Sequence, residues 1–176
     1  MEQCTFSKRI YEGKVVNLRV DNVLLDGKQN VTREVVEHRG ATVIVPILDR
    51  DQVVLVRQYR YPIGTELLEI PAGTLNDGES PEDCARRELE EETGYSSEDV
   101  VKMFECYVAP GYSTEKLHFY LARKLTKTRQ NPDEDERLSV EMVSLSNVME
   151  KIRSGEICDA KSICAIFRTS DFIEHQ

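Results

Sequence analysis

The carboxylates of one short segment are the residues of this chain best suited to chemistry. Residues 73–95 place two arginines, Arg86 and Arg87, among the side chains of Glu79, Glu88, Glu90, Glu91 and Glu92. Acidic groups at this density repel one another, and a cation held among them turns that repulsion into a binding site. Ligands that are all oxygen atoms suit a hard cation such as Mg²⁺, with Mn²⁺ as a substitute. The alternative is a solvent-exposed acidic helix with ion pairs four residues apart, and spacing alone leaves both interpretations open.

Local signals predict that most of these glutamates lie on a helix spanning residues 81–92. Ser80 is a good N-cap, Pro81 suits the first helical position, and Asp83 resembles the acidic member of a capping box. Gly94 follows as a stop signal.

The helical spacing brings three of the glutamates to one side. Glu88 and Glu92 are four residues apart, and Glu91 is three residues from Glu88. Arg87 lies four residues before Glu91, so we expect the guanidinium to pair with this carboxylate and orient it.

The same segment resembles the Nudix hydrolase box, in which glycine, glutamate, arginine and apolar positions stand at fixed spacing. The nine matching positions are Gly73, Glu79, Arg87, Glu88, Leu89, Glu91, Glu92, Gly94 and Tyr95. The resemblance implies an α/β/α sandwich that hydrolyses a nucleoside diphosphate linked to another group, with two or three divalent cations. By position, it implies that Glu88, Glu91 and Glu92 bind the metal and that Arg87 orients Glu91.

Composition argues against several classes of partner. The 176 residues suit one domain with a small appendage, and 40% of them are apolar, enough for a real core. The net charge of −9 argues against general binding to nucleic acid or an anionic membrane, but not against an anionic substrate neutralised by Mg²⁺ and local arginines. Without a run of about 18 apolar residues or an apolar signal stretch, we expect a cytoplasmic protein. Five scattered cysteines without a CxxC pair indicate reduced structural thiols rather than a zinc site.

Apolar periodicity predicts a chain rich in strands. Residues 5–38 are β-rich, with a hairpin turn at residues 24–28. Further strands are expected at residues 41–48, 53–60, 67–71, 101–108, 117–125 and 138–145.

Two more helices complete the predicted order of elements. Ser146 is the expected N-cap of a helix ending near Arg153, and residues 159–173 form a final amphipathic helix. Because strands and helices do not alternate strictly, the order favours an α+β fold with a mixed sheet. We expect an N-terminal β segment at residues 1–39, providing dimer and substrate contacts, and a hydrolase domain at residues 40–176.

Short runs outside the box resemble the ADP-ribose pyrophosphatase branch of the family. They are REVVEH at residues 33–38, RQYR at 57–60, EIPAG at 69–73, PGYSTE at 110–115 and GEICDAK at 155–161. Enzymes of this branch cleave ADP-ribose to AMP and ribose 5-phosphate. The resemblance also implies a homodimer, and an N-terminal β segment too small to bury a core alone agrees with it.

Four charged residues in these runs are candidate substrate contacts, and the backbone carbonyl of Ala72 is a candidate metal ligand by position. Arg60 would clamp the diphosphate, unless it is an exposed charge at a strand end. Arg33 and Glu34 would meet the adenosine end, in the family often across a dimer interface, or would form an ordinary surface ion pair. Glu115 would meet the ribose or the metal cluster, or would be a solvated carboxylate.

The acidic loop at residues 133–136 holds the candidates for a general base. Aligned to the strand that follows, Glu134 would take the proton of the attacking water, and Glu136 would bind a metal or that water. A purely solvated loop is the alternative. Some relatives stack adenine on an N-terminal aromatic residue, where this chain has Val15 and Val16 with Tyr11 nearby, so its preference for adenine stays open.

The predicted function is therefore Mg²⁺-dependent hydrolysis of ADP-ribose. One alternative is the same chemistry on another small-molecule substrate, such as GDP-mannose or the reduced dinucleotide NADH. The other is a nucleotide-binding sensor without catalysis, and a box that has lost none of its carboxylates argues against it.

Overall fold

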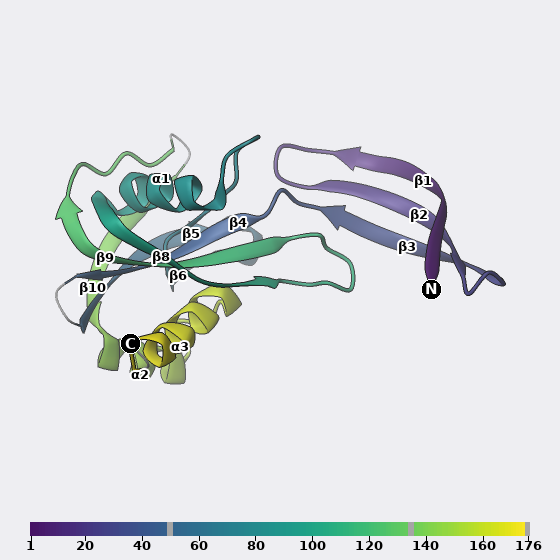
Figure 1. The fold of residues 1–176 in the computed structure, drawn as a ribbon. Coiled ribbons are helices and arrows are strands. Elements are labelled where there is room, and N and C mark those ends of the chain that lie inside the picture. Colours follow the sequence, from purple (N-terminus) through teal and green to yellow (C-terminus); the bar gives the residue numbers. More distant parts are fainter. Residues whose placement is uncertain (49–50, 134–135, 175–176) are drawn as a thin grey trace. The chain divides into compact units, whose positions relative to one another are not determined.

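The apolar runs of the sequence become the strands of two separate sheets. The structure is a computed structural model, and it describes residues 1–48, 51–133 and 136–174 (Figure 1). The chain divides into two compact units, residues 1–40 with 105–117 and residues 41–104 with 118–176. The domain boundary expected between residues 39 and 40 stays a prediction.

The first unit is built on an antiparallel sheet in the order β1-β2-β3. Its strands are β1 (Glu2–Glu12), β2 (Asn17–Leu25) and β3 (Gln29–Glu37). The predicted hairpin turn joins β2 to β3, where Asp26 and Gly27 both have a positive φ, as a type I′ turn requires. Every residue of β1 is exposed, so this sheet buries little apolar surface of its own.

Residues 105–117 belong to this first unit because they pair with β3. The backbone N–H of Val36 donates to the carbonyl of Tyr112 at 2.8 Å, and the N–H of Thr114 donates to the carbonyl of Val36 at 2.9 Å. The side chain of Thr114 also accepts from the backbone N–H of His38 at 2.9 Å. These bonds fix the segment that carries Glu115 against the N-terminal sheet.

The second unit contains the larger sheet, in the order β10-β5-β4-β9-β8, with β6 beside β5 and β7 beside β4. The strands are β4 (Ala41–Leu48), β5 (Gln52–Arg60), β6 (Thr65–Glu69), β7 (Ala72–Thr74), β8 (Tyr95–Tyr107), β9 (Lys116–Lys127) and β10 (Leu138–Ser144). A short 3₁₀ turn, Tyr61–Ile63, separates β5 from β6. All predicted strands of this region are present.

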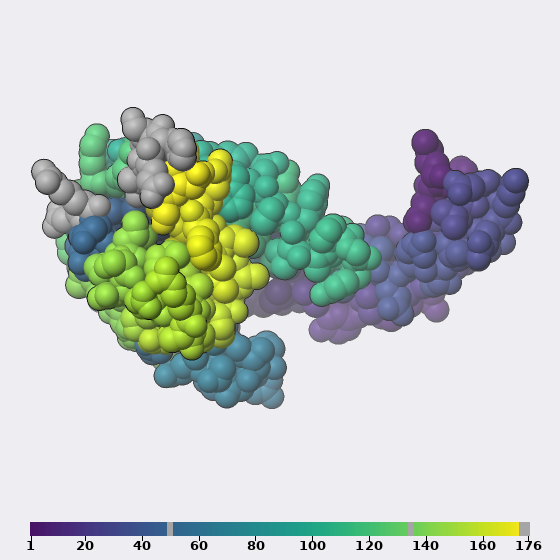
Figure 2. Space-filling view, turned by 90° about the horizontal axis from the view of Figure 1, so that it is seen from below, coloured from purple at the N-terminus to yellow at the C-terminus, as the bar shows by residue number. Residues whose placement is uncertain are grey.

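Helices cover both faces of this sheet. They are α1 (Pro81–Thr93), α2 (Leu145–Ser154) and α3 (Ala160–Glu174). Helix α1 packs on β4, β5 and β7, while α2 and α3 lie across the sheet from it and beside each other (Figures 1 and 2). Because both faces of the central strand β4 are covered, seven of its eight residues are buried, which confirms the predicted α+β sandwich. No helix in the described residues is long and apolar enough to cross a membrane.

A cluster of buried side chains fixes α1 to the sheet. Ala85 and Leu89 of α1 pack with Ile44 of β4, Val54 of β5 and Tyr120 of β9. The apolar side of the helix thus faces the core, and its glutamates at positions 88, 91 and 92 are held on a defined side.

The ends of α1 follow the predicted signals, whereas the predicted cap of α2 is wrong. The Ser80 hydroxyl accepts from the N–H of Asp83 at 3.1 Å, and Gly94 ends α1 with a φ of 67°. Helix α2 is capped by Ser144, not Ser146, and the Ser144 hydroxyl accepts from the N–H of Asn147 at 3.4 Å. The helix begins earlier because the pairing of β10 with β5 ends at Ser144 and the chain turns directly into the helix.

Candidate active site

Helix α1 and strand β7 together form a cluster of carboxylates. Glu88 and Glu92 are buried, with 8% and 2% of their surfaces exposed, and Glu91 is partly buried. The backbone N–H of Ala72 donates to Oε2 of Glu92 at 3.0 Å, which ties the helix to β7. A Cβ placed on Gly73 would lie 1.8 Å from Oε1 of Glu88. Position 73 therefore needs a glycine so that the strand can approach the Glu88 carboxylate.

Arg87 joins three carboxylates, those of Glu79, Glu88 and Glu91, into one hydrogen-bonded unit. Its NH1 donates to Oε2 of Glu91 at 2.8 Å, at the predicted spacing of four residues, and to Oε1 of Glu88 at 2.5 Å. Its Nε and NH2 form a fork with both oxygens of Glu79, at 2.8 and 3.0 Å. The role proposed for Arg87 in orienting Glu91 remains a prediction, but the contact it requires is present.

Glu79 is also a site residue, but its partner could not be identified from the sequence. It belongs to the nine box positions, yet nothing local indicates its contact, because it lies before the helix and eight residues from Arg87. Hydrogen bonds from Arg87 lower the pKa of Glu79 to about 2, although burial opposes this effect. Glu79 therefore stays ionised and anchors Arg87 through Nε and NH2, which leaves NH1 to bond Glu91.

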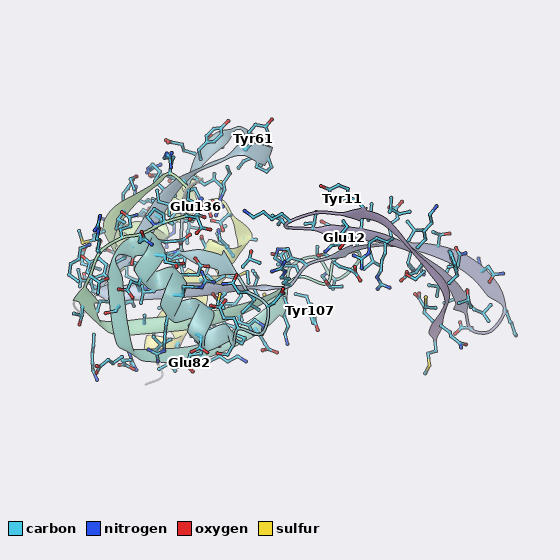
Figure 3. All side chains as sticks on the ribbon, turned by 90° about the horizontal axis from the view of Figure 1, so that it is seen from above. Tyr11, Glu12, Tyr61, Glu82, Tyr107 and Glu136 are labelled. Atoms are coloured by element: carbon cyan, nitrogen blue, oxygen red, sulfur yellow. The ribbon has the colours of Figure 1, made fainter. Side chains whose placement is uncertain are left out.

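Burial makes the ionised form of two α1 carboxylates, Glu88 and Glu92, energetically unfavourable. Burial raises the pKa of Glu88 to about 7, against the opposing charge of Arg87. Burial, with repulsion from Glu88 and Glu136, raises the pKa of Glu92 to about 8. Glu136 contributes to both shifts, and it lies toward the end of α1 opposite to Glu82 (Figure 3). Glu134, the expected general base, falls outside the described residues.

The donor set of this cluster fits a hard divalent cation. Within the described residues, one oxygen each of Glu88, Glu91 and Glu92 accepts no hydrogen bond, since Arg87 and Ala72 engage only the other one. A cation there would relieve the cost of two buried carboxylates. As these side chains stand, however, no group of three or more His, Cys, Asp or Glu in the described part of the chain is arranged to hold a metal ion. The carboxylates therefore supply oxygen ligands for a cation, although they are not yet arranged around one.

Arg60, the expected diphosphate clamp, is held by a buried partner. Its Nε and NH2 donate to the two oxygens of Glu69 at 2.9 and 2.7 Å, across the β5–β6 pair. The Arg60 side chain is 36% exposed and that of Glu69 only 2%. Lys161 of α3 also bonds Glu69, and it bonds Asp159 at 2.9 Å. Arg60 is thus not a loose charge at a strand end, and Glu69 and Lys161 are functional candidates that sequence reasoning missed.

The remaining predicted substrate contacts lie in the first unit. Arg33 pairs with Glu2 at 2.6 Å, and Glu34 is exposed. Glu115 is partly buried, with its Oε1 3.9 Å from Nδ1 of His38. The roles proposed for Arg33, Glu34 and Glu115 stay predictions.

Comparison with known proteins agrees with the geometry of the carboxylate cluster. Residues 37–165 match the family model of the NUDIX domain. The chain is 38% identical over 169 residues to an ADP-ribose pyrophosphatase of Bacillus subtilis (strain 168), an alignment that covers 94% of this chain and 91% of the relative. It is 37% identical over 167 residues to a methanol dehydrogenase activator of Bacillus methanolicus, covering 94% of this chain and 90% of that protein.

A solved structure has the same fold. The crystal structure of an ADP compounds hydrolase superposes with a TM-score of 0.88 at 23% identity, covering 99% of this chain and 95% of that one. With the box residues assembled on α1 and β7, and with relatives alike over nearly the whole chain, the protein belongs to the Nudix family.

Proposed function

We propose that this protein hydrolyses the diphosphate bond of ADP-ribose, with water as the second reactant and AMP and ribose 5-phosphate as products. The observation that carries the proposal is the pair of buried carboxylates on one helix, Glu88 bonded to Arg87 and Glu92 bonded to the backbone N–H of Ala72. The relative from Bacillus subtilis, which is named an ADP-ribose pyrophosphatase, supports the choice of substrate.

Divalent cations belong to this chemistry, since Nudix hydrolases generally depend on them. The residues that would hold two or three Mg²⁺ ions, with Mn²⁺ as a substitute, are Glu88, Glu91, Glu92, Glu136 and the carbonyl of Ala72. Bound there, the metal would neutralise the diphosphate and acidify the attacking water.

The protein's own groups perform the other tasks. Glu134 takes the proton of the attacking water as general base. Arg60 donates to the diphosphate oxygens through its guanidinium and holds the phosphorus in line for attack. Arg87 keeps Glu91 oriented, and its fork with Glu79 keeps Arg87 itself in place. Arg33 and Glu34 contact the adenosine end, and Glu115 contacts the ribose side.

The decisive experiment is turnover on a panel of ADP-ribose, GDP-mannose, UDP-glucose and NADH in Mg²⁺, with a phosphatase added to release phosphate from the products. We expect ADP-ribose to be preferred. Preference for another compound would keep the hydrolase and overturn the substrate. Nucleotide binding without turnover on any compound would favour the sensor.

The panel is repeated with Glu88→Gln, which removes a metal-binding charge without changing the shape of the side chain. We expect turnover to fall by about 10²-fold or more with the fold intact, because the cation loses a buried ligand. Glu90→Gln is the matched control, since Glu90 is exposed on the same helix. Near-normal activity of Glu88→Gln would contradict the assignment of the site.

The assembly and cellular location belong to the same proposal. We expect a homodimer because β1 is exposed along its whole length and carries apolar side chains such as Phe6 and Ile10, at 58% and 51% exposure. We expect a cytoplasmic protein because none of its five cysteines forms a disulfide within the described residues, a state that a reducing compartment maintains. The net charge of −9 makes nucleic acid and anionic membranes unsuitable partners.

A further inference from the structure

Four charged side chains form a partly buried network beside the carboxylate cluster. Glu69 receives the fork of Arg60 and a bond from Lys161, and Lys161 also bonds Asp159. The two positive and two negative charges balance, so the network carries no net charge.

The network is anchored on both of its sides, so Glu69 is fixed in place. Oδ2 of Asp159 accepts from the N–H of Ser162 at 3.0 Å at the start of α3. The Ser162 hydroxyl in turn accepts from the N–H of Ile70 at 2.9 Å. These bonds join the end of β6 to α3, and they leave the Glu69 carboxylate little freedom to follow Arg60 if Arg60 moves.

Stability alone does not explain a buried ionic network. Taking the Glu69 carboxylate out of water is costly, and a well-packed apolar residue of similar volume commonly serves stability as well or better. The buried Glu69 carboxylate therefore calls for a role beyond packing, and the surroundings of Arg60 indicate what that role is.

Arg60 ends β5, one of the strands on which α1 packs, and its charge attracts that of Glu92 on α1. Arginine forms strong forked hydrogen bonds with carboxylates, so an arginine near Glu92 competes directly with a cation for this carboxylate. In the structure Arg60 pairs with Glu69 instead of Glu92. The two oxygens of Glu69 accept from Nε and NH2 of Arg60 at 2.9 and 2.7 Å. NH1 of Arg60 makes no hydrogen bond within the described residues, which leaves this edge for a phosphate oxygen.

We propose that Glu69 is a positioning residue that holds Arg60 away from Glu92, so that Glu92 stays open to a cation and Arg60 stays open to a phosphate. This inference rests on the proposed function, since it assumes that the carboxylates of α1 bind metal. It assigns Glu69 no contact with the substrate; Glu69 acts through Arg60.

The test measures metal binding without any substrate. Free Mn²⁺ gives a sharp six-line electron paramagnetic resonance signal that is lost on binding, so a titration yields the Mn²⁺ affinity directly. We expect Glu69→Gln to bind Mn²⁺ about tenfold more weakly, because the released Arg60 pairs with Glu92. The double variant Glu69→Gln with Arg60→Met should return to within about twofold of the wild-type affinity, because the competing cation is gone.

Two further variants separate this role from general damage. Glu141→Gln weakens one of the two ion pairs of Arg57, an arginine on the same strand whose Nε lies 2.6 Å from Oε1 of Glu141, and should leave Mn²⁺ binding unchanged. Glu88→Gln should weaken Mn²⁺ binding strongly; if it does not, the metal site of the proposed function fails, and that failure is distinct from a failure of the inference about Glu69.

The inference is overturned if folded Glu69→Gln binds Mn²⁺ as tightly as the wild type, or if removing Arg60 does not restore the affinity. Thermal unfolding checks that each variant is folded. Should Glu69→Gln not fold, Glu69→Asp replaces it, since it keeps the charge but withdraws the carboxylate from the fork. A weaker affinity that Arg60→Met restores would then support the inference, and an unchanged affinity would refute it.

Discussion

A glycine is required at position 73 because of a contact and not because of a left-handed backbone. A Cβ at Gly73 would collide with the Glu88 carboxylate, at 1.8 Å from Oε1 and 2.4 Å from Oε2. Real Cβ contacts are never this short, so the carboxylate would have to move. The sequence motif marks the glycine, and the structure supplies the reason for it.

Replacing Gly73 with alanine should therefore damage activity more than stability. The group displaced is the flexible end of Glu88, so we expect a stability loss of about 1–3 kcal/mol. Turnover should fall by about 10²-fold, since a metal-binding carboxylate is pushed out of place. Turnover on ADP-ribose and thermal unfolding are measured together. Gly111→Ala is the control for stability, because a Cβ there meets nothing within 4 Å; a fully active Gly73→Ala would disprove the argument.

At the scale of elements, the two capped helices differ in how far local signals locate them. Helix α1 begins at Pro81 as predicted, because Ser80 and Pro81 leave one consistent starting point. At α2 both Ser144 and Ser146 satisfy the local preference for an N-cap. The end of β10 decides between them, because its last pair with β5 joins Ser144 to Gln52.

This difference predicts unequal effects of two serine substitutions. Ser144→Ala removes the acceptor for the N–H of Asn147 and should lower the free energy of unfolding by about 1 kcal/mol. Ser146→Ala lies within the first turn and should change it by less than about 0.5 kcal/mol. Urea unfolding of both variants gives the comparison. Equal losses, or a larger loss at Ser146, would show that the cap is misassigned.

At the scale of the whole molecule, the N-terminal sheet needs a partner that its own unit does not provide. All eleven residues of β1 are exposed, and Val23 is the one apolar residue of β1, β2 and β3 in the described structure that is fully buried. A sheet of three strands is stable when an apolar face is covered. A second copy of the chain is the occupant we propose for this face.

The proposed homodimer predicts a mass of twice 20.2 kDa in light scattering. Ile10→Glu should shift the protein toward the monomer, because it places a charge on the surface that the dimer would bury. Ile63→Glu is the matched control, since the exposed fractions of Ile63 and Ile10 are similar, at 59% and 51%. Ile63 lies in the second unit, away from β1 in the sequence. A wild-type monomer, or equal behaviour of the two variants, would contradict a dimer formed through β1.

Local chemistry made α1 and its functional side predictable from sequence. Contacts four residues apart, such as Arg87 with Glu91, follow from helix geometry itself. Neighbouring residues likewise determine the caps of α1, the buried run of β4 and the hairpin turn at Gly27. The nine positions that match the Nudix box indicated which reaction these residues catalyse. The helical spacing alone had left a metal site and a solvent-exposed helix both open.

The tertiary structure decided the contacts between residues that are distant in the chain. Glu69 meets Arg60 only because β6 pairs with β5, and it meets Lys161, 92 residues away, only because α3 packs against that region. Glu79 accepts hydrogen bonds from Arg87 only because the chain before α1 folds back against the helix. Gly73 lies next to the Glu88 carboxylate only because β7 packs against α1. Such contacts depend on strand register and helix packing, which are set by burial over the whole unit and not by any short stretch of sequence.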